Sequence, residues 1–134
     1  MQMEYVTLYV DDIPAAMDFY EKVLKLSPRF VHESGDYAEM ETGTTVLAFS
    51  HHDLAKTLVP QGYQKASPDS LPLGMQLGFS VDGVAETYNR ALEHGAKPIA
   101  PPEEKPWGFK SAFIMDPSGH LIEFSRKMHP VNPS

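Results

Sequence analysis

A single carboxylate lies inside a segment that otherwise fits a buried strand. Residues 116–119, Asp-Pro-Ser-Gly, have the composition of a tight turn, and residues 120–126 follow as a strand whose side chains alternate between two faces. Ile122 and Phe124 share one face, and Glu123 lies on the other. A carboxylate in such a strand normally has a metal ion, a ligand or an ion-pair partner. Glu123 is therefore the first candidate for a functional residue.

Composition excludes several kinds of chemistry. The chain has no cysteine, so it has no disulfide, no thiol nucleophile and no zinc–thiolate site, and any metal would need His, carboxylate or amide ligands. The glycines are dispersed and form no phosphate-binding loop, and no Ser/His/Asp motif is evident. Eleven Lys and Arg against eighteen Asp and Glu give a net charge of −7 without a basic cluster, which argues against a nucleic-acid partner.

Length and hydropathy are typical of a small soluble domain. The 134 residues, 42% of them hydrophobic, suffice for one domain or for two small halves joined into one. No apolar run reaches membrane-spanning length, and no basic-then-apolar leader precedes the first strand. We therefore expect a cytoplasmic protein without a membrane partner.

The first half of the chain predicts one helix and four strands. Residues 5–10 alternate as a strand, and apolar residues at helical spacing predict a helix over 13–25, with a capping carboxylate and an early proline at residues 11–14. We expect Pro28 to end this helix. Three short strands at 29–33, 37–41 and 45–50 complete the half, separated by Gly-containing turns.

The second half repeats this order after a connector at 51–74, which contains Pro and Gly and in which we expect a short helix at 53–58. Residues 75–81 form a strand, Asp82 caps a helix that Gly95 ends, and strands follow at 97–100, 110–115 and 120–126. A proline-containing loop at 101–106 joins the first two of these strands. Residues 128–134 form a tail that we expect to be frayed.

The two halves can be aligned residue by residue. Residues 6–11 match 77–82, and residues 47–50 match 122–125, so the unit β-α-β-β-β occurs twice. We predict an α+β fold in which residues 1–127 form one domain of two βαβββ modules, 4–50 and 75–127. The helices would cover the outer faces, and the other faces would line a curved groove. Four positions become equivalent under this repeat: Tyr5, Ala48, Gln76 and Glu123.

Two segments resemble the signatures of a known family. Residues 6–26, V-T-L-Y-V-D-D-I-P-A-A-M-D-F-Y-E-K-V-L-K-L, and residues 116–124, D-P-S-G-H-L-I-E-F, are similar to the opening and closing motifs of the vicinal oxygen chelate superfamily. This superfamily includes glyoxalases, extradiol dioxygenases and bleomycin-resistance proteins. Metal enzymes of this superfamily typically carry His, Gln or Glu as metal ligands on the first and last strands of each half, and the resemblance places these ligands at the four equivalent positions. Gln76 and Glu123 match this pattern, whereas Tyr5 and Ala48 depart from it.

The resemblance is closest to the metal-free bleomycin-resistance branch, whose members sequester a drug without altering it. It implies no cofactor, a homodimer, and a small organic ligand, cationic or aromatic, held in the groove by Glu123 and Gln76. Pro106-Trp107-Gly108 resembles a P-W-G element of that branch, so Trp107 is either an aromatic wall for the ligand or a packing residue. The weaker candidates for ligand contacts are Tyr5, Tyr9 and Phe113. A role in antibiotic resistance would follow.

Two other functions stay open. One is a divalent-metal lyase, isomerase or dioxygenase of the glyoxalase type, in which Gln76 and Glu123 would bind Zn, Ni, Mn or Fe together with His51 or His52. Neighbouring residues on a strand point to opposite faces, so at most one of these histidines would face inward, and otherwise both are exposed loop residues. The other is a non-catalytic regulator that senses a metabolite. No catalytic residue is assigned.

Overall fold

The computed structural model describes residues 1–128, and the predicted tail falls outside the described residues from 129 onward. The chain divides into two compact units, Met1–Ala66 and a second that begins at Ser67, which we call module 1 and module 2. The elements of module 1 are β1 (Tyr5–Val10), α1 (Ile13–Leu24), β2 (Pro28–Val31), β3 (Tyr37–Glu41), β4 (Val46–His51) and α2 (His52–Leu58). Those of module 2 are β5 (Leu77–Ser80), α3 (Val84–Glu93), β6 (Lys97–Glu104), β7 (Phe109–Met115) and β8 (Leu121–Lys127).

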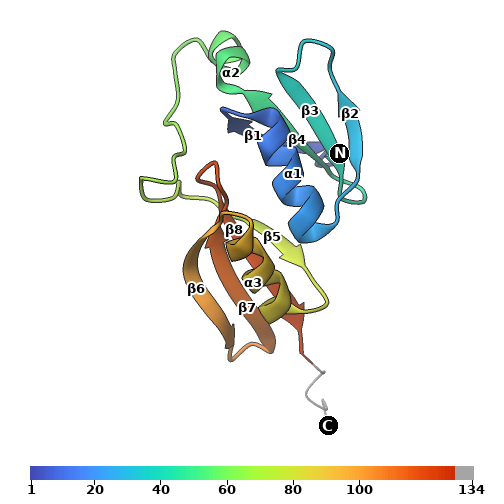
Figure 1. Ribbon diagram of the computed structural model, residues 1–134, viewed down its shortest axis with the longest axis vertical. Coiled ribbons are helices and arrows are strands. Elements are labelled where there is room, and N and C mark those ends of the chain that lie inside the picture. The colour runs from blue at the N-terminus through green and yellow to red at the C-terminus, as the bar shows by residue number, and fades with distance from the viewer. Residues whose placement is uncertain (129–134) are drawn as a thin grey trace. The chain divides into compact units, whose positions relative to one another are not determined.

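Each module is a four-stranded mixed sheet with one long helix against it (Figure 1). The strand order is β1-β4-β3-β2 in module 1 and β5-β8-β7-β6 in module 2. In both sheets the first pair of strands is parallel and the other pairs are antiparallel. The α+β class and the βαβββ order of both modules are therefore confirmed.

The core of module 1 lies between the sheet and α1. Helix α1 has apolar residues at helical spacing, and five of its side chains are buried: Ile13, Ala16, Phe19, Tyr20 and Val23. The Tyr20 ring packs on Phe49 of β4, with 5.6 Å between ring centroids. Phe49 has no exposed surface, as expected for a residue on the helix-facing side of the sheet.

Both ends of α1 have local causes. Asp12 caps the first turn by accepting a hydrogen bond from the Ala15 backbone N–H at 3.0 Å, which confirms the capping carboxylate. The helix ends at Leu24, one residue before the predicted end, and Pro28 is not the residue that stops it. Lys25 adopts a left-handed backbone with φ of 60°, and its N–H bonds back to the Tyr20 carbonyl. Pro28 instead begins β2.

The core of module 2 lies between its sheet and α3. Phe124 and Ile122 of β8 and Ile114 of β7 have no exposed surface. The prediction that Asp82 caps α3 is wrong: Gly83 is the N-cap, and it makes no side-chain cap. The predicted loop at 101–106 is also wrong for its first part, because β6 continues to Glu104. Strand β6 lies at the edge of the sheet and has a neighbouring strand on one side only. Prolines are tolerated there because their missing N–H groups can face away from that neighbour.

The internal repeat extends to the register of the strands. Val6 pairs with Leu47 in module 1, and its counterpart Leu77 pairs with Ile122 in module 2. The edge strands repeat as well, since the register shifts by one residue between Pro28 and Phe30 in β2 and between Pro98 and Ala100 in β6. The alignment made from sequence is thus confirmed in three dimensions.

The connector is shared between the two modules. Its helix α2 begins at His52, one residue before the predicted start, and packs on β1 and β4 of module 1. Ser67 and Pro68 belong to module 2, where the Pro68 carbonyl accepts a hydrogen bond from Lys97. Among the described residues, no helix has the length and apolar content needed to cross a membrane.

Candidate functional site

Glu123 lies in the middle of β8, on the face of the sheet that α3 does not cover. Its neighbours Ile122 and Phe124 are buried, whereas Glu123 is half-buried. Gln76, immediately before β5, donates a hydrogen bond from Nε2 to Glu123 Oε1 at 3.1 Å. Gly78 pairs with Glu123 across β5 and β8, and a Cβ at Gly78 would lie 3.7 Å from Glu123 Oε1. On the other side, Phe113 of β7 pairs with Glu123. Three of the predicted positions are thus neighbours.

The Asp-Pro-Ser-Gly turn fixes the start of β8. Asp116 is buried, and its Oδ1 accepts hydrogen bonds from the backbone N–H groups of Ser118 and His120 at 2.9 Å each. Gly119 has φ of +97°, and a Cβ there would lie 2.7 Å from the Ser67 Cα and closer to other backbone atoms of that residue. The turn therefore needs both its carboxylate and its glycine for structure.

Trp107 lies at the turn between β6 and β7, with 70% of its surface exposed. The turn is closed by hydrogen bonds from the Lys105 N–H to the Phe109 carbonyl and from the Gly108 N–H to the Lys105 carbonyl. Phe113, which pairs with Glu123, lies six residues after Trp107 along the chain. Among the described residues no hydrogen bond links Trp107 to Glu123, and the contact of Trp107 with a ligand stays a prediction.

The two tyrosines predicted for the groove belong to module 1. Tyr5 is 61% exposed. Tyr9 is half-buried against the connector, with ring centroids 4.9 Å from Tyr63 and 6.4 Å from His52. Burial, followed by the neighbouring Tyr9, raises the pKa of the Tyr63 phenol. Tyr9 thus holds the connector on β1, whereas Tyr5 is available at the surface of module 1.

The histidine pair is not the exposed loop pair that the sequence suggested. His51 Nδ1 accepts the backbone N–H of Asp53 at 3.0 Å and so caps α2. His52 is only 3% exposed, and its Nδ1 lies 2.6 Å from the Tyr63 hydroxyl because α2 turns the ring into the module. Both histidines are engaged through Nδ1.

Sequence reasoning missed a polar network on the helix-free face of module 1. Glu39 of β3 pairs with Ala48 and accepts hydrogen bonds from Arg29 Nε at 3.1 Å and from the Tyr37 hydroxyl at 2.7 Å. Arg29 Nη1 also donates to Glu41 Oε1 at 3.1 Å. Burial, followed by the bond to Glu39, raises the pKa of Tyr37 to about 12. The carboxylates, Glu41 first, also raise the pKa of Arg29.

A signal for this network was present in the sequence. Residues 37–41 were predicted as a strand, and alternation places Tyr37, Glu39 and Glu41 on one face. Extending the repeat to this strand would have matched Glu39 with Phe113 of the other half. The contribution of Arg29 could not be foreseen, because it depends on the register shift in β2.

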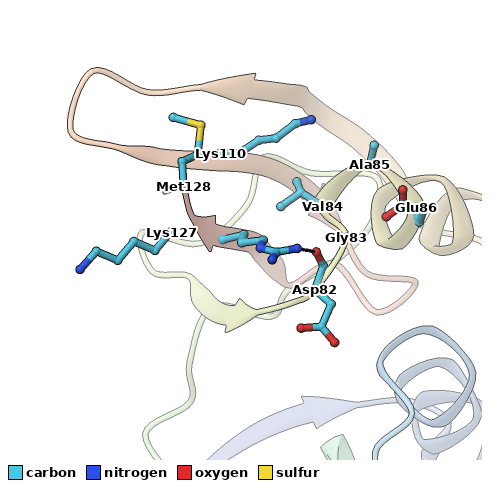
Figure 2. A pocket seen from close by; sticks show the side chains of 9 residues that line it. Asp82, Gly83, Val84, Ala85, Glu86, Lys110, Lys127 and Met128 are labelled. Carbon is cyan, nitrogen blue, oxygen red and sulfur yellow. Dashed lines mark hydrogen bonds between the residues drawn. The ribbon is translucent and has the colours of Figure 1, made fainter. Parts of the chain in front are cut away.

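A separate hollow of about 670 Å³ lies on the α3 side of module 2 (Figure 2). Its basic residues are Lys110, Arg126 and Lys127, and most of the rest belong to residues 82–86, which lead into the first turn of α3. Arg126 donates to the Asp82 carbonyl. The side chain of Glu86 occupies the space beside Gly83, so the helix start already has an acidic neighbour. Glu123 faces the other side of the sheet.

The residues do not fit the metal site that the resemblance implies. Module 2 offers an amide and a carboxylate at the equivalent positions, but module 1 offers Tyr5 and Ala48. Ala48 cannot bind a metal, and Tyr5 could do so only as a phenolate. Within residues 1–128, no group of three His, Asp or Glu side chains is arranged to hold a metal ion.

Comparisons with known proteins agree with this architecture. A sequence model of the Glyoxalase/Bleomycin resistance protein/Dioxygenase superfamily matches residues 2–124. The uncharacterized protein YraH of Bacillus subtilis (strain 168) is 25% identical over 129 residues, which are 96% of this chain and 100% of YraH. A glyoxalase-related enzyme from Fulvimarina pelagi has a TM-score of 0.81 at 24% identity, with 98% of this chain and 90% of that chain covered. A glyoxalase/bleomycin resistance protein/dioxygenase family enzyme from Burkholderia phytofirmans PsJN has a TM-score of 0.79 at 21% identity, with 96% and 100% covered. At these identities the structural likenesses establish the fold.

Proposed function

The chain belongs to the Glyoxalase/Bleomycin resistance protein/Dioxygenase superfamily, and we propose that it binds and sequesters a small organic molecule without a metal ion. One observation carries the proposal: of the four positions that the repeat makes equivalent, only Gln76 and Glu123 have side chains suited to bind a metal, and these two are joined to each other by a hydrogen bond of 3.1 Å. An amide and a carboxylate held together in this way offer a ligand both hydrogen-bond acceptors and a donor.

The set of available ligands supports the same proposal. A catalytic divalent metal usually needs about three protein ligands and an open position for substrate. The four equivalent positions supply two suitable side chains, Gln76 and Glu123, and module 1 adds none. Without a metal or another electrophile to stabilise an enolate, a lone carboxylate is also a weak general base. Binding is therefore better supported than catalysis.

The chemistry of the Glu123 neighbourhood indicates the kind of ligand. The second oxygen of the carboxylate can accept a charged hydrogen bond, and the Gln76 oxygen can accept another. The paired Phe113 supplies an apolar ring beside them. We propose a cationic or aromatic ligand, with contacts to Trp107, Tyr5 and Tyr9 as further proposals, and a homodimer as the assembled form. Sedimentation at micromolar concentration would test the dimer, and a monomeric mass would overturn it.

The test combines a ligand screen with one substitution. Aromatic antibiotics, bleomycin-like glycopeptides, glutathione adducts and catechols would be screened by thermal shift, because a ligand that prefers the native state raises Tm. For a cationic hit, Glu123→Gln should raise Kd by roughly tenfold or more, since a hydrogen bond to a charged group is worth about 1.5–3 kcal/mol. Glu93→Gln, at an exposed position of α3, is the matched control and should leave Kd unchanged. An unchanged Kd in Glu123→Gln would move the site elsewhere.

A metal-dependent lyase, isomerase or dioxygenase is the competing proposal, and the closeness of two ligand types, Gln76 and Glu123, favours it. His51 or His52 would have to complete the site through the other ring nitrogen, since both already use Nδ1. Stoichiometric Mn, Fe, Ni or Zn in the purified protein would support this competitor.

A further inference from the structure

The polar network of module 1 has more negative than positive charge. It joins two carboxylates, Glu39 and Glu41, to one guanidinium, that of Arg29, so one negative charge remains. Glu39 uses both oxygens, one for Arg29 and one for Tyr37. Glu41 uses only Oε1, and among residues 1–128 its Oε2 has no hydrogen-bond partner. The side chain of Glu41 is 46% exposed, so this free oxygen can be reached by a ligand.

A local irregularity brings Arg29 to this face. Pro28 pairs with Met40 and Phe30 pairs with Glu39, so Arg29 is an extra residue in β2. Such a bulge redirects side chains that would otherwise alternate, and here Arg29 and Phe30 both lie on the Glu39 side. The counterpart of Arg29 in module 2 is Ile99, at the corresponding shift in β6. The charged arrangement is therefore specific to module 1.

Exposed aromatic rings lie beside the network. Phe30 is 46% exposed, and its ring centroid is 6.4 Å from that of Tyr37. Tyr5, on β1, is 61% exposed, and it is near enough to contribute to the raised pKa of Tyr37. Aromatic faces attract cations, and the attraction adds to that of a nearby carboxylate. A planar aromatic molecule also gains from covering such rings.

We propose that the face formed by Glu39, Glu41, Phe30, Tyr37 and Tyr5 binds a planar organic cation, with Glu41 as its charged partner. This inference rests on the proposed binding function and adds a second anchor, in module 1, to the one at Glu123. Arg29 orders the two carboxylates and offsets part of their charge. An organic anion would meet a net negative cluster here and is disfavoured.

The test uses thioflavin T as a planar cation and anilinonaphthalene sulfonate as a planar anion, each titrated into the full-length protein and followed by fluorescence. We expect Glu41→Gln to raise the Kd for thioflavin T by roughly five- to tenfold, as one partly solvated charge is lost. Asp18→Asn is the matched control. It removes the same charge from an ion pair with Lys22 on α1 of the same module, and it should change Kd by less than about twofold.

A second variant should have the opposite effect on the Kd for thioflavin T. Arg29→Gln leaves both carboxylates unopposed, so it should tighten thioflavin T binding, and Glu39→Gln should weaken binding and lower the pKa of Tyr37. The Tyr37 titration also shows that a variant retains its fold around the network. The proposal is overturned if Glu41→Gln and Asp18→Asn act alike, if Arg29→Gln weakens binding of the cation, or if the native protein prefers the anion.

The same titrations separate this inference from the proposed function. If Glu123→Gln abolishes thioflavin T binding while Glu41→Gln leaves it intact, the module 1 site is overturned and the anchor at Glu123 stands. If the reverse is found, the module 1 site stands and the Glu123 anchor is overturned.

Discussion

On the helix-free face of module 1 the carboxylates of Glu39 and Glu41 lie on β3, whereas in module 2 the carboxylate of Glu123 lies on β8. Glu39 is paired with Ala48 across β3 and β4, and Phe113 is paired with Glu123 across β7 and β8. Glu39 is equivalent to Phe113, and Ala48 is equivalent to Glu123. The charged residue of the pair therefore lies on β3 in module 1 and on β8 in module 2. A repeat that conserves strand register does not conserve the chemistry of the surface it builds.

The reason is that packing restricts one face of each sheet more than the other. Phe49 and Phe124 are equivalent, and both are fully buried on the helix side. The edge strands share even a proline and a one-residue shift, at Pro28 and Pro98. On the helix-free faces Glu39, Phe113 and Glu123 are only half-buried, so such side chains can differ without loss of the core. Function is therefore best sought where the two modules differ.

The largest expected effect tests the shared part of the comparison. Phe49→Ala and Phe124→Ala should each lower the free energy of unfolding by about 3–5 kcal/mol, because each removes a fully buried ring. Urea unfolding followed by circular dichroism measures both. If one substitution cost less than about a third of the other, the two cores would not be equivalent.

A smaller effect should differ between the modules. Gly119 and Gly43 lie in corresponding turns and both have positive φ, +97° and +111°. An alanine at either position takes a backbone conformation that costs about 1–3 kcal/mol. Only at Gly119 would the new Cβ also meet backbone atoms, those of Ser67. Gly119→Ala should therefore destabilise more than Gly43→Ala in the same unfolding assay, and equal losses would contradict the close approach of Ser67.

The module 1 network predicts a pH dependence. The folded pKa of Tyr37, about 12, lies above the ordinary value of 10.0, so its contribution to stability is present below pH 10 and is lost as pH rises toward 12. Phenolate absorbance should show one tyrosine that titrates late, and Tyr37→Phe should remove it. Glu39→Gln should move that titration toward the ordinary value, and no movement would show that Glu39 is not a cause of the shift.

The smallest expected effect concerns the surface of module 1. Lys65 Nζ lies 3.0 Å from Asp11 Oδ2 and donates a hydrogen bond to Asp11 Oδ1 at 3.1 Å. This hydrogen bond lowers the pKa of the Asp11 carboxyl below 3.8. Its contribution is therefore present above pH 3.8 and is lost as pH falls through the lowered pKa. Lys65→Met should cost about 0.2–1 kcal/mol at neutral pH and less in acid, by urea unfolding. Lys56→Met, on α2, is the control, and an equal loss there would contradict the pairing.

Sequence patterns predicted much of the fold because they depend on local periodicity. The strand at 5–10, a capping carboxylate before the first helix and the matched halves follow from alternation, helical spacing and turn residues, and all are confirmed. The errors have physical causes that such patterns do not contain. A left-handed Lys25 ended a helix before its proline, and an edge position let β6 run through prolines.

The candidate site was predicted less completely. Glu123 and Gln76 were brought together as expected, since both follow from the repeat. Burial of His52 depends on how α2 folds back, and the Arg29 network depends on a bulge. Neither has a simple sequence signature. The roles of Trp107 and of the other ligand contacts remain predictions.

Elemental analysis of the purified native protein tests the central claim, metal-free binding, most directly. The account predicts well under one equivalent of Mn, Fe, Ni or Zn per chain, and a Tm that chelator treatment does not change. One equivalent of a metal per chain, with a Tm that falls on chelation and recovers when the metal is restored, would contradict it.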